Sequence, residues 1–316
     1  MDLELMKILP HPFNQSAFTK TRIAFSTSRK IYLYDFIDNQ ELSLIDQVVV
    51  SNVDVFEFNE KGDMLYILNT AGKFFVYDIN SKKLTYIKND FLDECFGNIL
   101  VMDNFKCLWC SNNILFEYCN KEKRIIKIFK SSYTLKSILG LSNEFVYLTA
   151  FNDDILYIIK FSLIDMSIVD TVKIKGYHKI SKVWYSQDSE KFFIIKGSKL
   201  MYLENSNDFK NENVEVKIVC KLKDLKNAIY FKESQNRNLI AFSSFNSLTV
   251  LNISKKISEV LLQTTNKSKV YIRNITFAFE DRYIGVSYDN FDYGGKTYFY
   301  KCIDSTGDGS LCSVKT

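Results

Sequence analysis

Histidine, the side chain that most often acts as a general base, is scarce in this chain. It contains two histidines: His11 stands between Pro10 and Pro12, and His178 lies in the run Gly176-Tyr177-His178-Lys179. A Ser/His/Asp or Cys/His arrangement would have to use one of them, because the imidazole takes the proton of the nucleophile.

Acidic pairs are the second possible source of chemistry. They occur at Asp153-Asp154 and at Asp289 with Asp292. Two carboxylates at a suitable separation can perform glycosidic acid/base chemistry, but neighbouring acids in turns are usually solvated. The sequence therefore favours a protein without catalytic residues and leaves an enzyme open.

Two patterns resemble metal sites. Cys107-Leu-Trp-Cys110 resembles half of a zinc site, yet it falls in an expected strand, where residues three apart point to opposite faces. The run from Asp304 to Gly309 resembles the start of a calcium loop, but Lys315 stands where the bidentate acid should be. We expect free cysteines, a polar turn, no metal and no cofactor.

The elements that must position these residues are clearest at residues 53–88. This stretch contains four runs rich in β-branched and aromatic residues, at 53–58, 64–68, 73–78 and 84–87. The polar segments between them contain glycine or asparagine, which suit tight turns. The stretch predicts a four-stranded antiparallel meander.

The same unit recurs along the chain. Its third strand ends in an apolar residue followed by a polar one, at Tyr34, Tyr77, Tyr118, Ile159, Leu203, Leu251 and Tyr300. The steps between these anchors run from 41 to 49 residues, near the ~40 to 45 residues of a four-stranded propeller blade.

The repeats predict an all-β fold: a single β-propeller domain, 1–316, of four-stranded antiparallel blades, seven in number, with six or eight left open. The expected blades are 1–50, 51–91, 92–132, 133–176, 177–224, 225–269 and 270–316. Residues 3–9 form either the inner strand of the first blade or the outer strand of the last. In the second case the two ends of the chain would close the ring together.

With this period and strand order, the chain resembles the WD-repeat-like family of β-propellers. Tyr34-Asp35 and Tyr77-Asp78 stand where that family often has Trp-Asp. No unit carries the family's Gly-His pair, so its His/Asp hydrogen-bond network does not carry over. The resemblance implies a propeller fold and matches no specific member.

Composition narrows the class of protein. Hydrophobic residues make up 47% of the 316 residues, enough for a large core, and the net charge of +4 is spread along the chain. Asp2 and Glu4 stand where a signal peptide would be basic, and no apolar run approaches the ~18 residues of a membrane-spanning helix. We expect a cytoplasmic protein with reduced thiols and no membrane insertion, and the oligomeric state stays open.

Loops at one end of the meander are the expected binding surface. Turns between the second and third strands lie at the same end as the connections between blades, and exposed aromatic side chains there can anchor a partner. The candidate binding residues in these loops are Tyr133, Tyr177, His178, Phe245, Phe291, Asp292 and Tyr293. The longest of these loops is the hairpin at residues 288–296.

The leading hypothesis is a non-catalytic scaffold or adaptor that binds a protein partner through this face. One alternative is an enzyme or small-ligand binder that uses the mouth of the channel with converging acids and His178. The other is an RNA-binding accessory subunit, because lysines and aromatics together can contact a backbone and stack on bases.

Overall fold

The computed structural model describes residues 2–37, 41–88, 98–186, 189–204, 216–222, 225, 228–234, 239–244, 247–253, 255–263, 270–278, 282–290 and 295–303. At residues 2, 37, 177, 257, 263, 270, 289, 290 and 303 it describes the backbone alone. Nearly all regular structure in these ranges is β, and helical structure is limited to short 3-10 turns such as η1 (Tyr177–Lys179).

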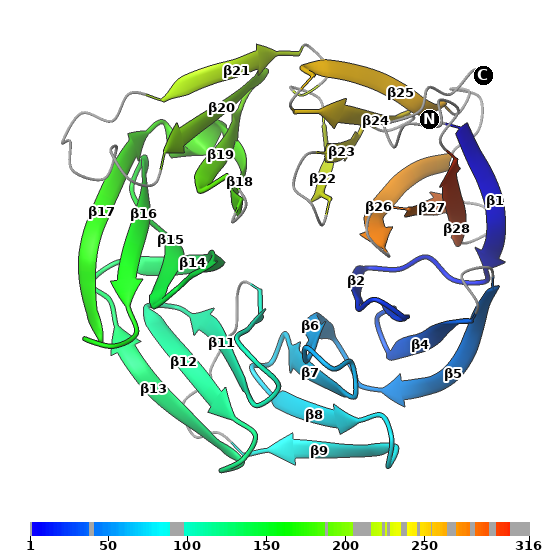
Figure 1. Ribbon diagram of the computed structural model, residues 1–316, viewed down its shortest axis with the longest axis horizontal. Helices are drawn as coiled ribbons and strands as arrows, with labels where there is room; N and C mark the ends of the chain where they lie inside the picture. Colours follow the sequence, from blue (N-terminus) through cyan, green and yellow to red (C-terminus); the bar gives the residue numbers. More distant parts are fainter. Residues whose placement is uncertain are drawn as a thin grey trace. The chain divides into compact units, whose positions relative to one another are not determined.

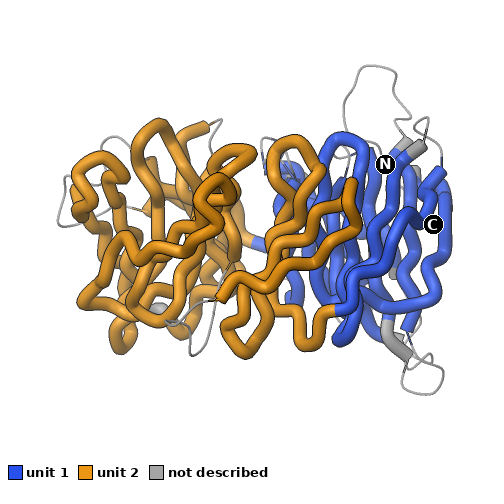
Figure 2. The backbone as a smooth tube through the Cα atoms, turned by 90° about the horizontal axis from the view of Figure 1, so that it is seen from below, with its two compact units in different colours: residues 1–49, 222–316 blue, residues 50–221 orange. Residues whose placement is uncertain are grey.

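The strands form seven four-stranded antiparallel sheets, which we number 1 to 7 in chain order (Figure 1). The chain also divides into two compact units, residues 1–49 with 222–316 and residues 50–221 (Figure 2). The expectation of one domain therefore stays a prediction.

The first unit contains sheets 1, 6 and 7. Sheet 1 consists of β2 (Gln15–Phe18), β3 (Arg22–Ser26), β4 (Lys30–Ile37) and β5 (Glu41–Val49). Sheet 6 consists of β22 (Tyr230–Glu233), β23 (Leu239–Ser243), β24 (Ser247–Asn252) and β25 (Ile257–Gln263). Sheet 7 consists of β26 (Val270–Ala278), β27 (Tyr283–Asn290), β28 (Lys296–Ile303) and β1 (Asp2–Leu9).

The second unit contains sheets 2 to 5. Sheet 2 consists of β6 (Val53–Phe58), β7 (Met64–Asn69), β8 (Phe74–Asp78) and β9 (Lys83–Ile87). Sheet 3 consists of β10 (Leu100–Val101), β11 (Lys106–Ser111), β12 (Ile114–Cys119) and β13 (Arg124–Lys130). Sheet 4 consists of β14 (Thr134–Ser142), β15 (Phe145–Asn152), β16 (Ile155–Ser162) and β17 (Ser167–Lys175). Sheet 5 consists of β18 (Ile180–Ser186), β19 (Lys191–Lys196), β20 (Lys199–Glu204) and β21 (Lys217–Lys221).

Sheet 2 shows why the local sequence folds this way. The Asn59 side chain accepts hydrogen bonds from the N–H groups of Asp63 and Met64, at 3.0 and 2.9 Å, and so closes the first hairpin. Gly62, in the same turn, has φ of 71°, a conformation that costs glycine little. The meander predicted for residues 53–88 is confirmed, and β7 runs one residue further than expected.

The N-terminal strand belongs to sheet 7. β1 pairs antiparallel with β28, from Asp2 opposite Ile303 to Leu9 opposite Thr297 (Figure 1). Of the two alternatives for residues 3–9, the structure therefore has the outer strand of the last sheet.

Neighbouring sheets bury a continuous apolar layer between them. Phe74 of sheet 2 stacks on Trp109 of sheet 3, with ring centroids 4.8 Å apart and planes at 8°. Cys107 belongs to this same cluster, whereas Cys110 packs in the cluster between sheets 3 and 4. The two thiols thus lie on opposite faces of β11, as residues three apart in a strand should, and both are buried.

The connections between sheets are held by backbone hydrogen bonds to the turn between the second and third strands. Examples in the second unit are Thr70 N–H to Asn52 C=O at 2.9 Å, Leu135 N–H to Asn112 C=O at 2.7 Å, and Gly176 N–H to Asp154 C=O at 2.9 Å. In these sheets, the turn and the connection lie at one end, as the meander order requires. We call this the connection end of each sheet.

Candidate binding site at the connection end

Four of the expected binding residues lie outside the described part of the chain. These are Phe245, Phe291, Asp292 and Tyr293. Their role, and that of the hairpin between β27 and β28, stays a prediction.

Tyr133 lies in the connection between β13 and β14. Its N–H donates to Ser131 Oγ at 2.9 Å, and its ring stacks on Tyr157, with centroids 4.4 Å apart. The side chain is half-buried against the cluster between sheets 3 and 4. Most of its contacts are therefore packing contacts within the fold.

His178 lies in the next connection, in η1, where the backbone alone is described for Tyr177. His178 Nδ1 lies 2.5 Å from Asp154 Oδ1, and the two side chains are 63% and 56% exposed. The hydrogen bond from His178 is the main cause that lowers the pKa of the Asp154 carboxyl. Because water reaches both groups, the pair lacks the desolvated surroundings typical of catalytic groups.

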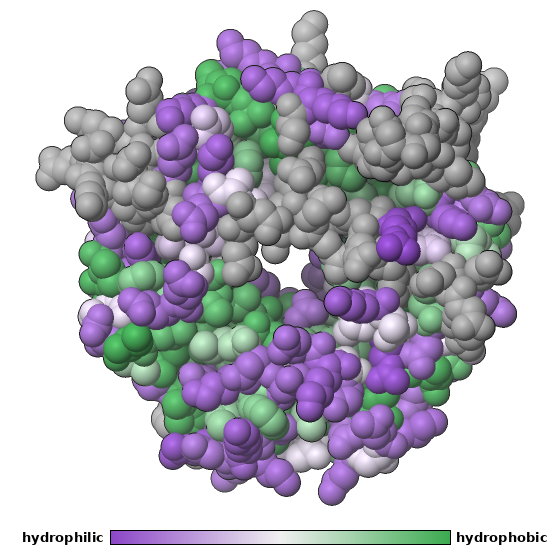
Figure 3. All heavy atoms as spheres, in the orientation of Figure 1, coloured by the Kyte–Doolittle hydropathy of each residue, from purple (hydrophilic) through white to green (hydrophobic). Residues whose placement is uncertain are grey.

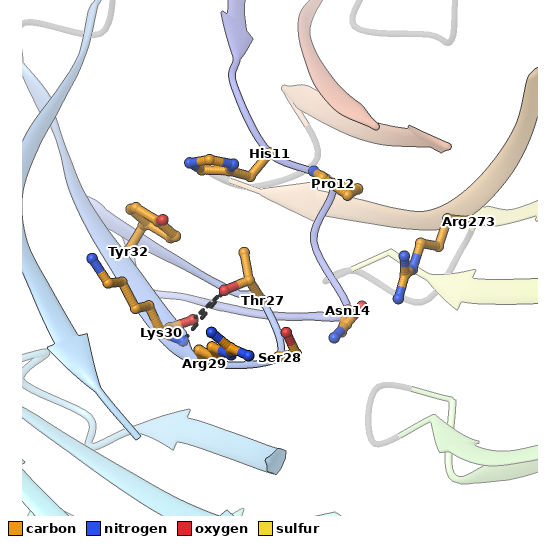
Figure 4. A pocket seen from close by; sticks show the side chains of 9 residues that line it. All are labelled: His11, Pro12, Asn14, Thr27, Ser28, Arg29, Lys30, Tyr32 and Arg273. Atoms are coloured by element: carbon orange, nitrogen blue, oxygen red, sulfur yellow. Dashed lines mark hydrogen bonds between the residues drawn. The ribbon is translucent and has the colours of Figure 1, made fainter. Parts of the chain in front are cut away.

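A cavity of about 360 Å³ lies at the connection end within the first unit. Two connecting segments and two strands supply its walls (Figure 4). The lining residues are His11, Pro12 and Asn14 from the β1–β2 connection, Thr27, Ser28 and Arg29 from the β3–β4 turn, Lys30 and Tyr32 from β4, and Arg273 from β26. We call this the basic pocket.

The wall formed by the β1–β2 connection is fixed by hydrogen bonds to sheet 7. Phe13 N–H donates to the buried Ser287 Oγ at 3.0 Å, and Thr297 Oγ1 donates to His11 C=O at 2.8 Å. The chain's two prolines, Pro10 and Pro12, both lie in this short segment and restrict its backbone. The wall is therefore shaped in advance of any ligand.

The opposite wall is a closed turn. Thr27 N–H donates to Lys30 C=O at 2.8 Å, and Lys30 N–H donates back to Thr27 Oγ1 at 3.3 Å. Lys30 Nζ donates to Gln47 Oε1 at 3.1 Å, which is a neutral partner and leaves the ammonium charge uncompensated by that contact. Arg29 is exposed at the tip of the turn.

The charged side chains among the described lining residues of the basic pocket are all cations. Its lining includes Arg29, Lys30 and Arg273, and none of the nine described lining residues is a carboxylate. Figure 4 shows Arg273 on the other side of the cavity from Arg29 and Lys30. In the face drawn in Figure 3, hydrophilic side chains gather over β2, the strand that follows the pocket's first wall. This arrangement attracts anions.

Sequence reasoning missed the pocket, although the β3–β4 turn that carries Arg29 is one of the turns it placed at this end. The pocket's other cations and His11 come from segments that only the pairing of β1 with β28 and the packing of sheets 1 and 7 bring together. The available signal was the run Pro10-His11-Pro12, the only prolines of the chain.

Two further kinds of feature were sought among the described residues: clusters of metal-ligating side chains and membrane-spanning helices. Within the described ranges, no three His, Cys, Asp or Glu side chains converge as they would around a metal ion. Among the same residues, no helix has the length and apolar character to cross a bilayer.

Comparison with known proteins identifies the fold. No family model and no curated protein sequence matches the chain. A solved structure that does match is the β-propeller domain of Cps50 (Swd1) from Myceliophteria thermophila, with a TM-score of 0.68. The match covers 95% of this chain and 100% of that domain, at 9% sequence identity. The chain is a divergent β-propeller.

The seven four-stranded sheets are the blades of this propeller. The predicted all-β fold of four-stranded antiparallel blades is confirmed, as is the resemblance to WD-repeat-like propellers at the level of fold. At 9% identity the likeness concerns the fold alone.

Proposed function

We propose that this propeller is a non-catalytic scaffold or adaptor that binds a protein partner through the connection ends of its blades. The observation that carries the proposal is the basic pocket, a preformed cavity with three cations and no carboxylate among its described lining residues. A cavity of this kind offers positive charge and hydrogen-bond donors to a ligand. None of its described lining residues is a carboxylate that could act as a base on that ligand. Binding accounts for this set of groups better than acid/base catalysis does.

The backbone at the connection ends supports the same proposal. Hydrogen bonds between turns and connections fix these loops, which lowers the entropy that a partner would lose on ordering them. Side chains on fixed loops can differ between blades without disturbing the strands beneath.

The test is affinity purification of the full chain from its native cells, followed by cross-linking and mass spectrometry. Three exposed lysines at each end of the blades serve as matched cross-linking sites. Those at connection ends are Lys73, Lys130 and Lys179, and those at the opposite ends are Lys20, Lys61 and Lys121. We expect cross-links from one specific protein to gather on the first three lysines. Cross-links gathered on the second three, or the absence of a specific protein, would contradict the proposal.

A further inference from the structure

The basic pocket presents cations from two sides. Arg29 comes from the β3–β4 turn and Lys30 from the start of β4, while Arg273 comes from β26 across the cavity (Figure 4). A ligand that contacts both sides needs acceptor atoms that point in several directions. A carboxylate has two oxygens in one plane, whereas a phosphate group has three strong acceptor oxygens and a charge of about −1.5 to −2.

The neutral groups of the pocket fit the same ligand. The hydroxyl of Ser28 and the side-chain amide of Asn14 lie between the two groups of cations (Figure 4). Both can donate to a phosphate oxygen, and arginine adds paired, charge-assisted hydrogen bonds to phosphate. The lining therefore supplies donors around the whole anion.

Size and rigidity restrict the ligand further. About 360 Å³ is near the lower end of the roughly 300–1,000 Å³ of small-molecule sites, so it suits a single phosphorylated side chain and its nearest neighbours. The Pro10–Pro12 segment is held by Ser287 and Thr297, so little of the wall must be ordered on binding.

A nucleic acid fits these observations less well. RNA sites combine a basic track along the backbone with aromatic side chains on which successive bases stack. The two rings in this cavity, His11 and Tyr32, pack on each other, with centroids 5.3 Å apart. A cavity of about 360 Å³ has room for one phosphate group and does not extend along a strand.

We infer that the basic pocket binds a phosphorylated serine or threonine of the protein partner, with Arg29, Lys30 and Arg273 around the phosphate. This inference rests on the proposed function and specifies the partner's chemistry. Phosphorylation of the partner then decides whether this part of the interface forms.

The experiment measures binding of the full chain to degenerate peptides by fluorescence anisotropy. One library has a fixed central phosphoserine, a second has serine there and a third has glutamate. Inorganic phosphate and a single-stranded RNA oligonucleotide serve as competitors. We expect the phosphoserine library to bind at least about tenfold tighter than the other two, because hydrogen bonds to a charged group are involved.

Matched variants locate the binding. Arg29→Gln should weaken binding of the phosphoserine library roughly tenfold to a hundredfold, and Arg29→Lys should lie between it and the wild type because it keeps the charge without the paired donors. Lys20→Gln removes the same charge at the opposite end of the same blade and should leave binding unchanged. Arg29 and Lys20 are both exposed in turns, so thermal unfolding of these variants should match the wild type.

Several results would overturn the inference. The first is equal affinity for the phosphoserine and serine libraries, and the second is an equal loss of affinity in Arg29→Gln and Lys20→Gln. The third is that RNA displaces the bound phosphoserine library at a lower concentration than unlabelled phosphopeptide does. The fourth is that phosphopeptides bind no tighter than inorganic phosphate. A partner that still cross-links to the connection ends after phosphatase treatment would refute the inference and leave the proposed function intact. If no protein cross-links to the connection ends even in extract not treated with phosphatase, the proposed function itself is refuted.

Discussion

Two buried serines at equivalent positions give a direct test of how the pocket wall is held. Ser287 is the fifth residue of β27, and Ser243 is the fifth residue of β23 in the neighbouring sheet. Both are fully buried. Ser287 Oγ accepts the Phe13 N–H at 3.0 Å, whereas Ser243 Oγ has no hydrogen-bond partner within the described part of the chain.

The same substitution should therefore have opposite effects at the two sites. Ser287→Ala leaves the buried Phe13 N–H without its acceptor, which costs about 1–3 kcal/mol of unfolding free energy. Ser243→Ala removes a hydroxyl whose burial is uncompensated, so the result should range from neutral to about 1 kcal/mol more stable. Both variants lose one oxygen atom, so the packing cost is shared and the difference reports the hydrogen bond.

Urea unfolding of both variants measures the difference, provided that the slope against urea stays that of the wild type. Hydrogen exchange gives a local check, because the Phe13 amide should exchange faster in Ser287→Ala and at the wild-type rate in Ser243→Ala. Equal losses of stability in the two variants, or an unchanged Phe13 amide in Ser287→Ala, would refute this account of the wall.

Three further outcomes are expected elsewhere in the protein. Phe74→Ala should cost about 3–5 kcal/mol of unfolding free energy because the ring is fully buried. Phe75→Ala, at a half-buried position, should cost about 1 kcal/mol or less. Equal costs of the two substitutions in urea unfolding would contradict the packing. An NMR titration should find the pKa of Asp154 below its ordinary 3.8. The contact with His178 should be present above pH 3.8 and be lost as the pH falls through the lowered pKa. If the pKa of Asp154 is the same in His178→Ala, that contact is not the cause. Burial raises the pKa of the Cys107 thiol, so alkylation followed by mass spectrometry should modify it in urea and spare it in the native protein at pH 8, and rapid native labelling would contradict its burial.

The strands were predictable because their signals are local. A run of β-branched and aromatic residues followed by a polar turn fixes a hairpin from neighbouring residues alone, as in residues 53–88. The opposite faces of Cys107 and Cys110 follow from the two-residue period of a strand. The position of β1 was left as two alternatives because its partner, β28, lies at the other end of the chain.

The site was less predictable because its residues are distant in sequence. Arg29 and Arg273 share a cavity only once β1 has paired with β28 and the sheets have packed. Aromatic residues in loops were a weaker guide, since Tyr133 uses much of its ring to pack on Tyr157. Composition shows that a loop contains a tyrosine, but the direction of the ring depends on the neighbouring strand.

The basic pocket depends on the same segment that completes the last blade. β1 supplies the outer strand of sheet 7, and the chain then passes directly through Pro10–Asn14 into the inner strand of sheet 1. Ser287 and Thr297, which hold this connection, belong to the strands of sheet 7 that β1 completes. Displacement of β1 would therefore expose the edge of β28 and free one wall of the pocket together. Closure of the last blade and the shape of the pocket are thus one structural event, which ties the proposed anion binding to the intact fold.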